Sequence, residues 1–164
     1  MIDLDITELF EEIVKELPEG LEILYPNGKG GTKVMKSPRL NYIFGSSQYI
    51  KDILDEYSKS SAQSERKFPL VALFTPISED RGDADYFSKA KVSLIIACSS
   101  CKEWSNEMRR TTSFKNILRP IYKRLLEVLY EDSRFDCDYD EKVKHSYSEN
   151  YSYGRYLSLI HISE

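Results

Sequence analysis

Residues 86–132, YFSKAKVSLIIACSSCKEWSNEMRRTTSFKNILRPIYKRLLEVLYED, decide the fold because their hydrophobic period changes once. Up to Ser99, small or apolar residues alternate with polar ones, which is typical of a strand with one face in a core and the other in water. These residues are Ala90, Val92, Leu94, Ile96 and Cys98. From Phe114 onward, apolar residues recur three and four positions apart, as on an amphipathic helix interrupted by Pro120. The stretch therefore predicts a long strand followed by a helix that packs on it.

The rest of the chain predicts a second helix layer and more strands. Asp5 and Glu8 have the spacing of a capping box, and the apolar stripe at 6–17 predicts a helix that ends before Pro18. We also expect strands at 21–25, 40–44 and 68–76, a helix from Ser46 or Ser47 to Tyr57, and a strand near 142–147. Between them we expect a loop at 28–39 and an acidic hairpin turn at 78–85. Together they predict an α+β single domain, with a predominantly antiparallel or mixed sheet and the N-terminal and C-terminal helices packed on one face.

Length and composition restrict the function classes. The 164 residues are 41% hydrophobic, which is enough for one core, and the net charge of −4 argues against general nucleic-acid binding. No apolar run approaches the roughly 20 residues that a membrane-spanning helix needs. The acidic start, Met1–Asp5, lacks the basic-then-apolar order of a signal peptide, so we expect synthesis and residence in a cytoplasm. Three cysteines do not make a disulfide framework.

The last eight residues, LSLIHISE at 157–164, resemble the translated read-through of a sequencing adapter. On that interpretation the natural domain covers residues 1–156, and His161 has no functional role. The alternative is an ordinary closing strand.

Two cysteine-based sites are possible. The order of a strand, Cys98-Ser99-Ser100-Cys101 and a possible helix is similar to that of thioredoxin-like proteins, in which a helix N-terminus stabilises a thiolate. However, thioredoxin-like proteins also place a proline on a later strand, beside the thiols. Here the only later proline is Pro120, which lies in the expected helix. Cys98, Cys101, Cys137 and His145 are also of the right types for zinc, although Cys137 and His145 are not closely spaced. We expect Cys98 to be a small core residue instead, with the thiol oxidoreductase as the alternative function.

Other motifs fail on their own spacing. The segment 28–33, GKGGTK, lacks the closing Gly-Lys-Ser/Thr of a phosphate loop. Asp136, Asp138 and Asp140 begin like a calcium loop, but its glycine and final glutamate are replaced by Glu141 and Tyr147. Two histidines in the whole chain support no catalytic triad. The sequence thus contains no convincing catalytic constellation.

A basic stripe predicts a contact between subunits. Lys115, Arg119 and Lys123 are spaced four residues apart and share one face of the expected helix. Acidic residues of the turn at 78–85 on a neighbouring copy could meet this stripe; they include Glu79, Asp80 and Asp83. Such a heterologous contact closes naturally into a ring.

One family has a similar order of elements and similar phrases. The strands FPLVALF at 68–74 and VSLII at 92–96, followed by the helix RRTTSFKNILRPIY at 109–122, resemble tail-terminator or tail-completion proteins of tailed bacteriophages and prophages. This resemblance implies a structural virion assembly protein without a cofactor. It would form a ring, often of six copies, that caps the tail tube and joins it to the head connector. The resemblance also implies a location in the host cytoplasm during assembly and then in the virion.

Overall fold

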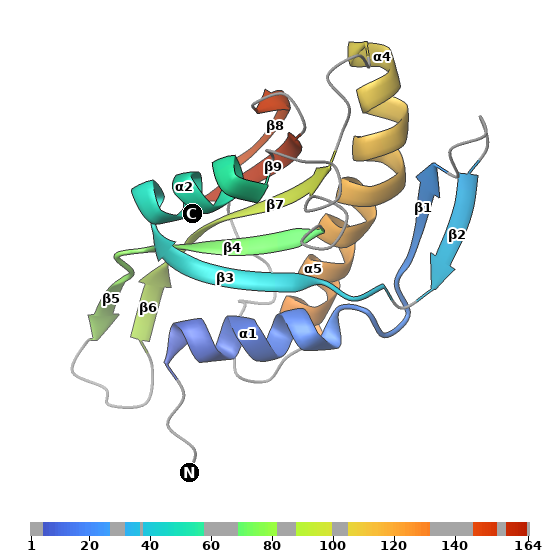
Figure 1. The fold of residues 1–164 in the computed structure, drawn as a ribbon. Helices are drawn as coiled ribbons and strands as arrows, with labels where there is room; N and C mark the ends of the chain where they lie inside the picture. The colour runs from blue at the N-terminus through green and yellow to red at the C-terminus, as the bar shows by residue number, and fades with distance from the viewer. Residues whose placement is uncertain are drawn as a thin grey trace.

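The computed structural model describes residues 5–26, 32–36, 38–57, 69–81, 88–99, 105–131, 146–153 and 157–163. In chain order the elements are α1 (Ile6–Glu16), β1 (Glu22–Pro26), β2 (Thr32–Lys36), β3 (Asn41–Ser46), α2 (Ser47–Tyr57), β4 (Leu70–Thr75), β5 (Ser78–Arg81), β6 (Ser88–Lys91), β7 (Ser93–Ser99), α4 (Asn106–Arg109), the π-helix η1 (Arg110–Leu118), α5 (Arg119–Glu131), β8 (Ser146–Tyr153) and β9 (Leu157–Ser163) (Figure 1). The predicted α+β fold is confirmed.

The main sheet has five strands in the order β3-β4-β7-β9-β8. β3 and β4 run parallel, and every other neighbouring pair is antiparallel. The sheet is therefore mixed, as predicted. Two smaller hairpins, β1–β2 and β5–β6, are separate two-stranded sheets.

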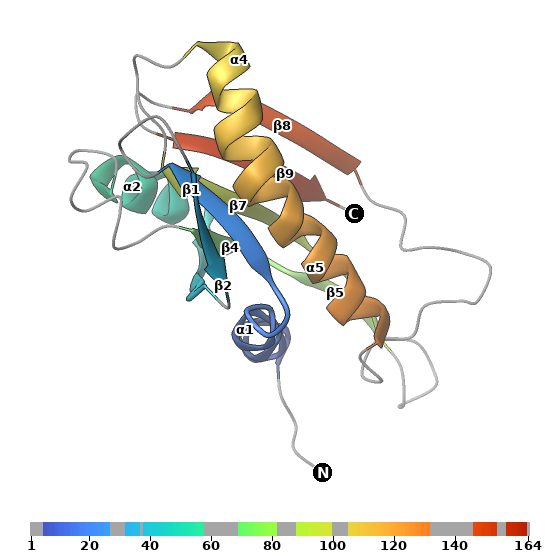
Figure 2. The same ribbon diagram turned by 90° about the vertical axis from the view of Figure 1, so that its right-hand side faces the viewer.

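Helices lie on both faces of the main sheet (Figure 2). One core cluster joins α1, β1, β4, β7, η1 and α5, with Phe10, Leu73, Ile96 and Phe114 among its buried members. A second cluster, on the other face, joins Ile50 and Leu54 of α2 to alternate residues of β4 and β7. The first and last helices thus share one core, while α2 covers the opposite face.

This arrangement corrects the prediction that one face of the long strand meets water. Ile95 and Ala97, on the face opposite Leu94 and Ile96, are also buried, because α2 packs on them. The strand is also not continuous, since β6 and β7 are separated at Val92. The alternation of Lys89 and Lys91 with small residues belongs to β6, a strand outside the main sheet.

Two further segments differ from the predictions. The segment 28–39, expected to be a loop, contains β2, which pairs antiparallel with β1 from Glu22↔Lys36 to Pro26↔Thr32. Near the C-terminus, the strand expected at 142–147 is found at 146–153 as β8. Residues 157–163 form β9, an interior strand paired with β7 on one side and β8 on the other.

Candidate functional site

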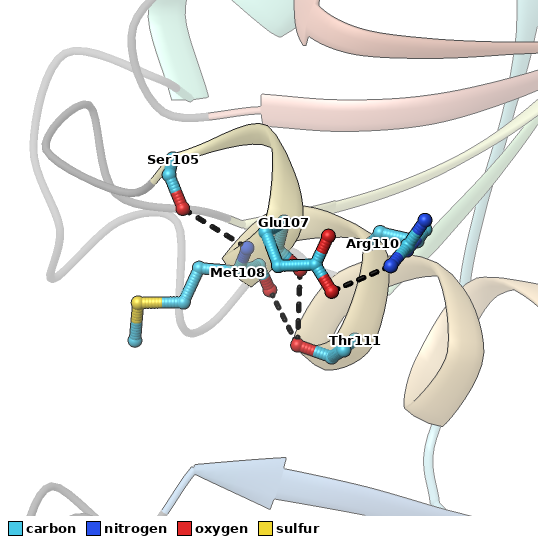
Figure 3. A network of polar contacts seen from close by, with 5 residues as sticks. All are labelled: Ser105, Glu107, Met108, Arg110 and Thr111. Atoms are coloured by element: carbon cyan, nitrogen blue, oxygen red, sulfur yellow. Dashed lines mark hydrogen bonds and ion pairs between the residues drawn. The ribbon is translucent and has the colours of Figure 1, made fainter.

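The long helix, α4–η1–α5, carries the basic stripe and contains a π-helical middle. Ser105 lies directly before α4, and its hydroxyl oxygen accepts a hydrogen bond from the backbone N–H of Met108 at 3.2 Å (Figure 3). The hydroxyl of Thr111 donates to the carbonyl oxygens of Glu107 at 3.1 Å and of Met108 at 3.2 Å. The Thr111 hydroxyl therefore competes with backbone N–H groups for these two carbonyl oxygens. It does so where the hydrogen bonding changes from the α-type to the π-type.

The π-helix ends at Leu118, two residues before Pro120. The backbone N–H of Arg119 bonds to the carbonyl of Phe114, five residues earlier, and α5 begins at Arg119. Because proline lacks an N–H, the α-type bond from residue 120 to Asn116 cannot form. The sequence predicted that the helix would kink or restart at Pro120, and the structure has a change of helix type there.

Arg119 is held within its own chain. Its Nε and Nη2 atoms donate to the two carboxylate oxygens of Glu149 on β8, at 2.8 and 2.9 Å. The hydroxyl of Tyr147 donates to the same carboxylate, and the rings of Tyr147 and Tyr122 lie 4.7 Å apart between centroids. These contacts raise the pKa of the Arg119 guanidinium, mainly through its hydrogen bond to Glu149. We call this group of four residues the α5–β8 clamp.

The other two residues of the basic stripe face solvent. Lys115 on η1 and Lys123 on α5 are both exposed, on either side of the clamped Arg119. The stripe predicted from i, i+4 spacing therefore consists of two exposed lysines and one arginine that anchors β8.

The acidic residues of the predicted contact lie partly on a hairpin. Glu79 and Asp80 are in β5, where they pair with Ala90 and Lys89 of β6. Asp83 lies outside the described residues. In Figure 1 the β5–β6 hairpin projects beyond the end of the main sheet.

Cys98 is a core residue, on the inner face of β7. Only 1% of its surface is exposed, and burial raises the pKa of its thiol to about 12, against opposing effects of the Ser113 hydroxyl and the Arg109 charge. A thiol oxidoreductase needs an accessible thiol with a lowered pKa, so Cys98 does not have the properties of that alternative. Cys101, Cys137 and His145 lie outside the described residues, and within the described part no three His, Cys, Asp or Glu side chains cluster as a metal site would require.

Sequence reasoning missed two exposed apolar sites. Among the described residues, the large hydrophobic side chains with the greatest exposure are Val34 on β2, at 52%, and Phe44 and Tyr49 at the β3–α2 junction, at 49% each. Val34 was missed because its segment was taken for a loop. Strand alternation at 32–36 was the signal that could have identified it.

Comparison with protein-family models and with curated proteins finds no match to this sequence. In the part of the chain that the structure describes, no helix is long and apolar enough to cross a bilayer.

Proposed function

We propose that this chain is a non-enzymatic virion assembly protein of the tail-terminator type. It would form a ring that caps a phage tail tube and contacts the head connector. The proposal starts from the sequence resemblance at 68–74, 92–96 and 109–122. It gains support from the arrangement of elements that a self-assembling protein could use.

The observation that carries the proposal is the pair of projecting hairpins. In Figure 1, β1–β2 and β5–β6 stand at opposite ends of the main sheet. Within the described residues, neither hairpin pairs with the main sheet. Projections at opposite ends suit head-to-tail contacts between identical copies, and such contacts close into rings when the rotation between copies allows it.

The basic stripe keeps a role in this proposal. Lys115 and Lys123 are exposed and would contact a neighbouring copy, with Glu79 and Asp80 of its β5 as acidic partners. Arg119 would support this surface from within, since it ties the long helix to β8. The thiol alternative receives no such support, because Cys98 is buried under the long helix.

Electron microscopy of the purified protein tests the proposal. We expect negatively stained particles of uniform diameter, with rotational symmetry and a central opening. Particles without symmetry, or filaments of variable length, would contradict a closed ring, because a heterologous contact that does not close produces open polymers. As a control for assembly through charged contacts, the same images at high salt should contain fewer rings.

A further inference from the structure

The β1–β2 hairpin exposes one face by strand alternation. Ile23 of β1 is buried in the core that the hairpin shares with the long helix. The next residue along that strand, Leu24, lies on the opposite face and pairs with Val34 of β2. Val34 and Lys36 are both exposed, so an apolar side chain and a cation project from the outer face of this arm. Among the described strands, β2 pairs only with β1, and no described strand lies along its outer edge.

A second apolar surface lies where β3 meets α2. Phe44 near the end of β3 and Tyr49 in the first turn of α2 are each 49% exposed. Between them in sequence is Gly45, whose missing Cβ lets the Tyr49 ring lie on the strand. We call Phe44, Gly45 and Tyr49 the β3–α2 corner.

The edge of β3 lacks the usual protection against pairing. Its residues, NYIFGS, include no charge and no proline, the features with which edge strands commonly prevent contact with other chains. Within the described residues β3 pairs only with β4, and no described strand lies along its other edge. An uncharged edge beside two exposed aromatic rings is suited to receive a strand from another molecule.

The charges around these two surfaces are opposite. Residues 32–39 contain Lys33, Lys36 and Arg39 and no acidic residue. Helix α2, which contributes Tyr49 to the corner, carries three acidic residues after it and one basic residue, Lys51. The acidic residues are Asp52, Asp55 and Glu56. Figure 1 places the hairpin and the β3–α2 junction at opposite ends of the molecule. On β1 the arm also contains one acid, the exposed Glu22, which pairs with Lys36. One copy therefore presents an arm with three cations and one acid at one end, and the acidic corner at the other.

We infer that the β1–β2 hairpin of one copy docks on the β3–α2 corner of the next copy. Val34 packs against Phe44 and Tyr49, β2 lies along the edge of β3 opposite β4, and Lys36 and Arg39 face the acidic residues of α2. This contact rests on the proposed self-assembly and adds a second pair of surfaces to the contact between the basic stripe and β5. Apolar packing and backbone pairing stabilise the contact, while the charges fix its direction.

Charge reversal in two separate proteins tests the contact. Variant A carries Lys36→Glu and Arg39→Glu, and variant B carries Asp52→Lys and Glu56→Lys; all four side chains are exposed. Each variant alone brings like charges together, and we expect its association to weaken by more than about tenfold, because like charges facing each other cost several kcal/mol. An equimolar mixture restores assembly, since each hairpin then meets a corner of opposite charge. Light scattering measures all three samples.

A matched control separates this effect from a change in net charge. Glu12→Lys with Glu16→Lys alters two exposed acidic residues of α1, spaced four apart as the two changes of variant B are on α2. We expect this control to assemble like the unaltered chain. If variants A and B also assemble like the unaltered chain, the contact is wrong and the proposed ring stands. If the unaltered chain never associates, the contact and the proposed function both fail.

Discussion

Arg119 and Glu149 are 30 positions apart in sequence and form a two-pronged ion pair, with N–O distances of 2.8 and 2.9 Å. The pair joins the first residue of α5 to β8, one of the two edge strands of the main sheet. Both side chains are partly shielded, at 39% and 15% exposure, so solvent weakens their attraction less than at an open surface. The arginine that the sequence assigned to a contact between subunits thus fixes an internal one.

Replacing Glu149 with Gln should destabilise the monomer. The substitution removes the negative charge but keeps the size, and we expect a loss of about 1–2 kcal/mol in the free energy of unfolding, typical of charge-assisted hydrogen bonds. Urea unfolding measures it. The control is Glu107→Gln, which breaks the exposed pair with Arg110 and should cost less than about 0.5 kcal/mol. Equal losses in the two variants would show that the α5–β8 clamp is no stronger than a surface pair.

Replacing Pro120 with Ala should change assembly more than monomer solubility. Alanine supplies the missing N–H and favours α-type bonding through the end of η1, where the structure changes helix type. A changed register turns Arg119 relative to Glu149 and shifts the exposed stripe. Light scattering of the variant should give an altered mass distribution at unchanged solubility. Unaltered assembly would count against a role for this helix junction.

The thiol of Cys98 should be unreactive in the folded protein. In a variant with Cys101→Ser and Cys137→Ser, the one remaining thiol should react with a disulfide reagent at least about a hundredfold more slowly than in denaturant, because it is buried and protonated. A rate close to that of the unfolded chain would support the thiol oxidoreductase instead.

The same thiol predicts how stability depends on alkaline pH. Burial raises the pKa of Cys98 to about 12 in the folded state, against an ordinary value of 9.0. The unfolded chain therefore loses this proton first, and the contribution to stability present below pH 9 falls as the pH rises, by up to about 1.4 kcal/mol per pH unit. Cys98→Ala should flatten that decline in urea unfolding between pH 9 and 11. An unchanged slope would mean that other groups cause it.

Ending the chain at Tyr156 tests the two interpretations of the last eight residues. In the structure, β9 supplies the hydrogen-bonding partners of β7 from Ser93 to Ser99. Its removal should lower the melting temperature by about 5 °C or more, because the ladder of an interior strand is lost. An unchanged melting temperature would favour the adapter interpretation of residues 157–164.

Local patterns predicted most of the fold, and contacts distant in sequence were missed. The stripe of α1 and its Asp5 cap follow from residue spacing, and the Asp5 carboxylate does accept the Glu8 N–H at 2.9 Å. By contrast, the burial of Ile95 depends on α2, which no pattern within β7 indicates. The π-helix has the same amphipathic residues as an α-helix, so the sequence does not distinguish the two.

The candidate site was less predictable than the fold. Spacing placed Lys115, Arg119 and Lys123 on one face, but it could not reveal Glu149, which comes from a polar segment without a clear period. The strand β1 was predicted, but β2 was missed because the glycines and lysines of residues 28–36 favour a loop over a strand. Its pairing with β1 outweighs that weak local preference.

Light scattering over a concentration range shows whether identical copies close into a ring. We expect one species whose mass is a fixed multiple of 19.1 kDa and does not grow further as concentration rises. A monomer at every concentration would contradict it.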